Sequence, residues 1–104
     1  MQHLIEGLVN FMLKHIVVYK ARTQEDVFRF KQDVEALRGV VEDIVSIEVV
    51  IDLLSTSTAS AILVSQFKDA EGLERYKNHP EHVKVAEFVK DVFEARLCAD
   101  YIEE

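Results

Sequence analysis

The order in which short strand-like segments and amphipathic segments follow one another constrains this chain more than any other feature. Four segments are short and rich in apolar and β-branched residues, which is typical of strands. Between the first and second of them, and again between the third and fourth, apolar residues recur every three or four positions, which predicts helices. The predicted strands are 13–20, 44–51, 61–67 and 96–102, and the predicted helices are 24–38, 70–77 and one that begins at Pro80.

Local signals at the ends of these segments agree with that assignment. Thr23 offers an N-cap oxygen, and Asp26 stands three residues later, where a capping box carries an acidic side chain. Gly39 stands where a glycine commonly ends a helix, and Pro80 suits a first helical turn because its missing N–H has no partner there. The order β-α-β-β-α-β predicts an α+β chain with a ferredoxin-like fold and a four-stranded antiparallel sheet.

Both faces of the predicted sheet are apolar. Two helices can cover only one face of such a sheet, yet the first and third strands carry further apolar residues on the other face. These residues are Ile16, Val18, Ile62 and Val64. Because a sheet that is apolar on both faces must bury both, we expect a second copy of the chain to pack here and form a homodimeric barrel. The alternative is a monomer in which the N-terminal segment covers this face.

Residues 1–12 are expected to form an extension before a single domain at 13–104. Apolar residues stand at positions 4, 5, 8, 9 and 12, which is the spacing of an amphipathic helix. Residues 2–12 contain no Lys or Arg and carry Glu6 in their middle, which is unlike a secretory signal peptide. We therefore expect the extension to be a helical packing element.

Composition excludes several classes of function. The net charge of −7 disfavours nucleic acid and anionic membranes as partners, because both attract clustered Lys and Arg. Cys98 is the single cysteine, so no disulfide can form within the chain, and a reducing cytoplasm is the expected location. The three glycines form no dinucleotide-binding motif, P-loop or nucleophile elbow.

Three segments resemble a known family. They read KHIVVYK at 14–20, FKDAEGLERYKNHPEHVKVAEFVKDV at 67–92 and Asp100-Tyr101, and the run at 76–82 is the specific part. The chain is similar to the stress-responsive A/B barrel domain (Dabb) family over about residues 12–102. The resemblance implies a dimeric α+β barrel. It also implies membership of a wider group that includes monooxygenases and polyketide cyclases without a bound organic cofactor.

His82 is the first candidate for chemistry. It follows Pro80 in the first turn of a predicted helix, where the positive end of the helix dipole disfavours the imidazolium ion and keeps the ring neutral. The resemblance implies that His82 is an acid or base beside Tyr76, as in polyketide-cyclising relatives. The alternative is that His82 makes local hydrogen bonds that fix the start of the helix.

His15 is predicted to share a pocket with these two residues. It lies on a strand face that we expect beneath the helices, where a polar ring needs a partner. His15, Tyr76 and His82 are the candidate catalytic residues of a pocket suited to removing a proton next to a carbonyl. The expected lining residues are Val17, Tyr19, Phe30, Leu63 and Phe67. The alternative is that His15 is a buried histidine with a purely structural partner.

A transition-metal site is not expected, and neither is a bound organic cofactor. Zinc sites use three or four converging nitrogen and sulfur ligands, and the sequence offers only His79 near His82 and one cysteine. A loosely held Mg²⁺ on backbone carbonyls stays open. Cys98 is expected mid-strand as a small buried apolar residue, and His79 is expected to cap the preceding helix or to contact a dimer partner.

Two functions from different classes follow. The first is a cofactor-free enzyme or binding protein for a small, mostly apolar, polyketide-like carbonyl compound. The second is a non-catalytic dimeric protein with a structural or stress-response role. The two are distinguished by whether the three candidate side chains line one cavity that opens to solvent.

Overall fold

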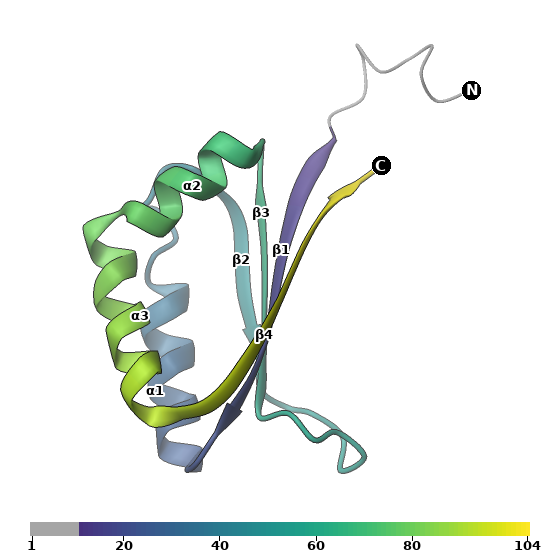
Figure 1. Cartoon of the computed structure of the whole chain (residues 1–104), viewed down its shortest axis with the longest axis vertical. Coiled ribbons are helices and arrows are strands. Elements are labelled where there is room, and N and C mark those ends of the chain that lie inside the picture. The colour runs from purple at the N-terminus through teal and green to yellow at the C-terminus, as the bar shows by residue number, and fades with distance from the viewer. Residues whose placement is uncertain (1–10) are drawn as a thin grey trace.

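A computed structural model describes residues 11–104 of the chain (Figure 1). The elements follow the predicted order, with the two predicted helices after the third strand separated by a single residue. The elements are β1 (Met12–Ala21), α1 (Gln24–Glu35), β2 (Ile44–Val50), β3 (Ala61–Phe67), α2 (Ala70–Asn78), α3 (Pro80–Val92) and β4 (Phe93–Glu103).

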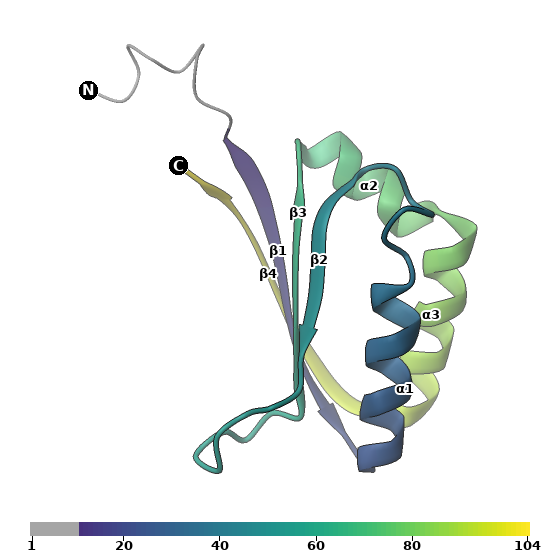
Figure 2. The same cartoon turned by 180° about the vertical axis from the view of Figure 1, so that it is seen from behind.

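The molecule has two layers, a four-stranded sheet and the helices on one of its faces. The strand order is β2-β3-β1-β4 and all three pairings are antiparallel. Seen from behind in Figure 2, α1 and α3 lie side by side over the sheet, with α2 at one end. The connection between β2 and β3 projects to the side of the sheet away from the helices. The predicted ferredoxin-like fold is therefore present in the described residues.

Helix α1 ends earlier than the sequence pattern indicates. The Thr23 side chain caps its start by accepting the Asp26 N–H at 3.2 Å, as predicted. The helix was predicted over 24–38, but its C-cap is Ala36. Leu37 is buried like a helical core residue, yet its N–H bonds to the Val34 carbonyl in a tighter turn. The apolar periodicity therefore continues beyond the end of the helix, because Leu37 is buried in the turn that follows.

Gly39 does not end the helix directly but lies three residues after its C-cap. Its φ is 85°, and it is the only residue with positive φ in the described part of the chain. That conformation strains residues with a Cβ, so glycine is suited to this turn. Gly39 therefore correctly indicates that the chain reverses here, but the prediction that Gly39 is the C-cap of α1 is wrong, because the C-cap is Ala36.

The two outer ends of the β1–β4 pairing also differ from the predictions. Strand β4 begins at Phe93 rather than at residue 96, directly after the last residue of α3. Strand β1 begins at Met12, which pairs with Glu103. Met12 therefore belongs to the sheet and not to a helical extension. The rest of that predicted helix, residues 1–10, lies outside the described residues.

The core lies between the sheet and the helices. Three aromatic rings join α1 to the strands: Tyr19 lies 4.5 Å from Phe30 and 5.4 Å from Phe93, measured between ring centroids. Phe30 and Phe93 are 5.1 Å apart. Aromatic pairs at such distances stabilise a core beyond the area that they bury. This cluster fixes α1 against β1 and β4 at one end of the sheet.

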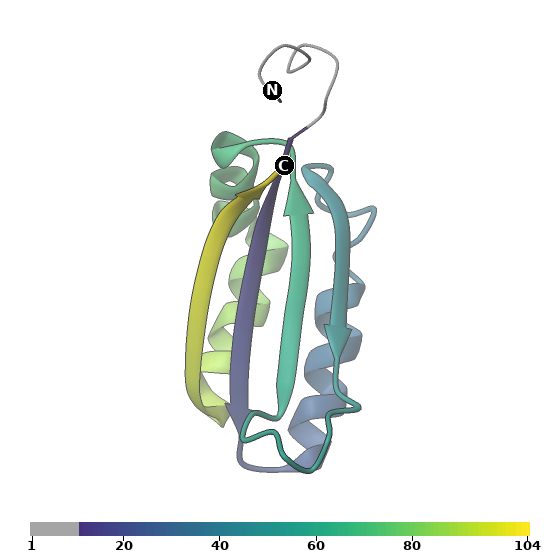
Figure 3. The same ribbon diagram turned by 90° about the vertical axis from the view of Figure 1, so that its right-hand side faces the viewer.

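No helix of residues 11–104 covers the opposite face of the sheet (Figure 3). The four residues predicted for a dimer interface share this face as two cross-strand pairs, Ile16 with Val64 and Val18 with Ile62. All four are partly exposed in the single chain. Leu97 lies opposite Val18 on β4, and its side chain is 76% exposed. An apolar surface thus runs across three adjacent strands.

None of the helices in the described part of the chain is both long enough and apolar enough to span a membrane.

Candidate functional site

A cavity of about 520 Å³ lies between the sheet and the helices. This volume is within the usual range for a small-molecule site, roughly 300–1,000 Å³. All three candidate catalytic residues line it. The lining also includes three of the five predicted pocket residues. These are Tyr19, Phe30 and Leu63, whereas Val17 and Phe67 are fully buried in the core and are not among the lining residues.

The break between α2 and α3 brings Tyr76 and His82 together. Tyr76 is in the last turn of α2, and Pro80 is the first residue of α3. His79 lies between the helices, and its Nδ1 accepts the backbone N–H of Glu81 at 3.1 Å, so it caps the start of α3. His79 is also the C-cap of α2, as predicted, because its backbone N–H donates to the Tyr76 carbonyl at 3.1 Å. The Tyr76 and His82 rings lie 4.3 Å apart between centroids.

The His82 ring is held in one tautomer. Its Nδ1 donates a hydrogen bond of 3.0 Å to the backbone carbonyl of Lys77, because a carbonyl can only accept. In the neutral ring Nε2 is then an unprotonated acceptor. Burial is the main cause of the lowered pKa of His82. The hydrogen bond to the backbone carbonyl of Lys77 raises this pKa, whereas the His15, Arg96 and Lys77 side chains lower it further. Burial, and not the helix dipole that we expected, is therefore the main reason why the His82 ring favours its neutral form.

Tyr76 presents a neutral hydroxyl. The side chain is almost completely buried, and burial strongly raises the pKa of its phenol. A phenol that stays protonated can donate a hydrogen bond to a developing negative charge on a substrate oxygen. The Tyr76 ring also packs against Phe67, with centroids 4.9 Å apart, so its position is fixed by the core.

His15 has a carboxylate partner that the sequence did not reveal. Its Nδ1 lies 2.5 Å from Oδ1 of Asp100, the residue directly opposite it on β4. His15 is buried, whereas Asp100 is exposed on the edge strand. In sequence, the two residues are 85 positions apart. Two signals in the sequence point to this partner, the period-two alternation of β4 and the Asp100-Tyr101 pair that resembles the family.

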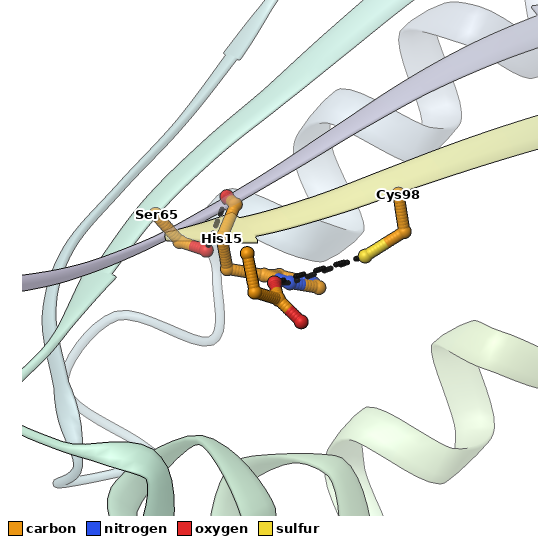
Figure 4. Close-up of polar contacts among 4 residues, drawn as sticks. His15, Ser65 and Cys98 are labelled. Atoms are coloured by element: carbon orange, nitrogen blue, oxygen red, sulfur yellow. Dashed lines mark hydrogen bonds and ion pairs between the residues drawn. The ribbon is translucent and has the colours of Figure 1, made fainter. Parts of the chain in front are cut away.

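Cys98 completes this polar group at the sheet edge. Figure 4 shows its thiol pointing toward the His15 ring, and Sγ lies 3.6 Å from Nδ1. Cys98 is exposed in the described chain and is not the small buried residue that we had expected. Burial is the first cause of a raised pKa for its thiol, and the carboxylate of Asp100 adds to the rise. Such a thiol is a poor nucleophile at neutral pH.

In the part of the chain that the structure describes, His15, Cys98 and Asp100 form a group that could hold a metal ion, because one ligand atom of each lies within 4.8 Å of the others. Two ligand atoms on one tetrahedral zinc ion are separated by about 3.3 Å, given metal–ligand bonds of roughly 2.0–2.1 Å. The His15–Asp100 separation of 2.5 Å is instead that of a short hydrogen bond. The absence of a transition metal stays a prediction, and a metal ion bound by His15, Cys98 and Asp100 would contradict it.

Comparisons with known proteins agree with the fold. A family model described as Stress responsive A/B Barrel Domain matches residues 13–103. No curated protein matches the chain. A dimeric protein of unknown function with a ferredoxin-like fold from Bacteroides fragilis is 33% identical, with a TM-score of 0.78 over 86% of this chain and 94% of that chain.

Two further solved structures have the same fold. A Dabb family protein from Mesorhizobium loti is 23% identical, with a TM-score of 0.73 over 90% of this chain and 98% of that chain. A hydroxynitrile lyase from Passiflora edulis is 14% identical, with a TM-score of 0.80 over 92% of this chain and 96% of that chain. These likenesses confirm the predicted ferredoxin-like fold.

Proposed function

The chain belongs to the stress-responsive A/B barrel domain family, and on that premise we propose that it binds a small, mostly apolar carbonyl compound and moves a proton next to the carbonyl. The observation that carries this proposal is that Tyr76 and His82, 4.3 Å apart between ring centroids, line one cavity together with His15. The cavity is otherwise mainly apolar. No organic cofactor or metal is needed for such a reaction.

Each of the three side chains has a distinct role. Nε2 of His82 takes a proton from the carbon next to the carbonyl, and the electron pair of the broken C–H bond moves to the carbonyl oxygen as an enolate. The neutral hydroxyl of Tyr76 donates a hydrogen bond to that oxygen. His15, held by Asp100 at 2.5 Å, is a second polar contact of fixed orientation. The fold can host an enzyme, since a hydroxynitrile lyase shares it.

The same proposal includes a homodimer formed through the open face of the sheet. Similar solved structures from Bacteroides fragilis and Thermobifida fusca are described as dimeric. The exposed apolar surface over Ile16, Val64 and Leu97 supports packing against an identical face. Leu54, in the connection that projects to this side, is 78% exposed and would gain a partner there. Because the single cysteine, Cys98, cannot form a disulfide within the chain, we propose that the protein is located in the reducing cytoplasm.

The alternative is a non-catalytic dimer. It explains the apolar sheet face equally well. It does not explain why three ionisable rings converge on a cavity, with one of them fixed in a tautomer that leaves an acceptor nitrogen available. The convergence favours the enzyme or binding protein.

A ligand screen with two matched cavity variants tests the proposal. Small apolar ketones and keto acids should raise the melting temperature and shift the NMR signals of the Tyr76 and His82 rings. Val89→Phe should abolish both effects because Val89 lines the cavity, whereas Val92→Phe, on the same helix but outside the lining, should retain them. Ligands that bind without moving either ring signal, or that bind Val89→Phe equally well, would place the site elsewhere.

A further inference from the structure

The charges around the cavity differ in sign from those of the protein as a whole. The chain carries 19 acidic and 12 basic residues. Among residues 11–104, the lining of the cavity nevertheless contains Lys77, Lys90 and Arg96 and no Asp or Glu. The carboxylate of Asp100 is outside this lining, where it is bound to His15 at 2.5 Å. In an acidic protein, a cavity whose charged lining residues are all basic concentrates positive potential where a ligand enters.

These three side chains are available to a ligand. Within residues 11–104, none of them forms an ion pair with a carboxylate, although other Lys and Arg side chains do. Examples are Arg75 with Asp43 at 2.8 Å and Lys31 with Glu35 at 2.8 Å. A cation that faces a partly enclosed cavity without a carboxylate partner is suited to receive an anionic group.

Arg96 is the best placed of the three. It lies on β4 opposite Tyr19, on the same face of the strand as Cys98 and Asp100. Its guanidinium carbon is 6.0 Å from the centre of the Tyr19 ring, which itself lines the cavity. Burial raises the pKa of both Tyr19 and Tyr76, and the charge of Arg96 opposes that rise at both residues.

We propose that the ligand of this cavity carries a carboxylate, which Arg96 binds with help from Lys77 at the cavity mouth. This inference rests on the proposed function and names the class of its ligand: a small apolar keto acid rather than a neutral ketone. The planar guanidinium matches a carboxylate with two parallel hydrogen bonds. The apolar body of the ligand lies against Phe30, Leu63 and Val89, which line the interior.

This arrangement gives the ligand an orientation. The carboxylate is held at β4, so the apolar end enters between the helices and the sheet. The ketone between them then lies near Tyr76 and His82. Replacing the carboxylate by a neutral amide of the same shape removes a charge-assisted contact and should weaken binding roughly ten- to a hundredfold.

The experiment uses one matched pair of probes on the full chain. The probes are 4-oxo-4-phenylbutanoate and its primary amide, titrated against wild-type protein, Arg96→Gln and Arg22→Gln by NMR. Arg22 is exposed and is not among the cavity lining residues, so its substitution makes the same change in net charge elsewhere. We expect wild type and Arg22→Gln to prefer the acid by at least about tenfold, and Arg96→Gln to lose the preference while its melting temperature is retained.

Equal binding of acid and amide by the wild type would overturn the inference and leave the proposed function standing, provided that both shift the His82 ring. A preference that persists in Arg96→Gln and in the double variant with Lys77→Gln would also overturn it. Failure of both probes to bind at millimolar concentration would overturn it as well, and neutral ketones in the ligand screen would then decide the proposed function separately.

If Arg96→Gln unfolds, Arg96→Lys should retain a reduced preference for the acid, and an unchanged preference there would contradict the role of the guanidinium fork.

Discussion

Nδ1 of His15 and Oδ1 of Asp100 lie 2.5 Å apart across the β1–β4 pairing, which joins the two ends of the described chain at the candidate site. The antiparallel register places the two residues directly opposite each other. The histidine is buried, and the carboxylate satisfies its ring nitrogen from the edge of the sheet.

Removal of this carboxylate should destabilise the fold. Asp100→Ala leaves a buried ring nitrogen without its partner, and we expect a loss of about 1–3 kcal/mol in the free energy of unfolding. Asp52→Ala, at an exposed position in the β2–β3 connection, should change that free energy by less than about 0.5 kcal/mol. Urea denaturation of both variants gives the comparison. An equally small effect in Asp100→Ala would show that water replaces the carboxylate at no cost.

The lowered pKa of His82 predicts how stability depends on pH. Because burial holds the pKa of the folded state below the ordinary value of 6.5, the unfolded chain binds a proton first as the pH falls. Stability is therefore fully present above about pH 6.5 and declines as the pH falls from there toward the folded pKa. His82→Gln should show a smaller decline over the same range. NMR titration of the ring signals measures the pKa itself, and a value above 6.5 would contradict the geometry given for this ring.

The apolar face of the sheet predicts a dimer that one charge can dissociate. Light scattering at micromolar concentration should give twice the chain mass of 12.0 kDa. Ile16→Asp places an unpaired charge in the interface, which should cost several kcal/mol of association free energy and give a monomer. Phe28→Asp changes an exposed apolar residue of α1, away from that face, and should leave the dimer intact. A wild-type monomer would refute the assembly.

The sequence predicted those parts of the site that depend on neighbouring residues. Tyr76 and His82 are joined by a helix break whose signals, Pro80 and the change of periodicity, are local. Thr23 was correct as an N-cap for the same reason. The position of His15 beneath the helices followed from the alternation along its own strand.

The parts that depend on pairing between distant segments were not predictable in this way. Asp100 and Cys98 reach His15 only through the register of β1 against β4, which no local pattern fixes. Strand β4 also begins at Phe93, three residues earlier than its composition indicated, because Phe93 packs into the aromatic cluster with Tyr19 and Phe30. Leu37 misled the prediction of the end of α1, since a residue buried in a turn looks the same in the sequence as one buried on a helix.

The most direct test of the central claim is the incorporation of deuterium from solvent at the carbon next to the carbonyl of an apolar keto acid, followed by NMR. Wild-type protein should exchange this proton faster than buffer alone, and His82→Gln should lower the rate by about 10²- to 10⁴-fold, or to the buffer rate, with little change in melting temperature. Exchange no faster than in buffer with every ketone and keto acid that binds the cavity would contradict the account. Retained exchange in His82→Gln together with a large loss of stability would show that His82 is structural and not a base.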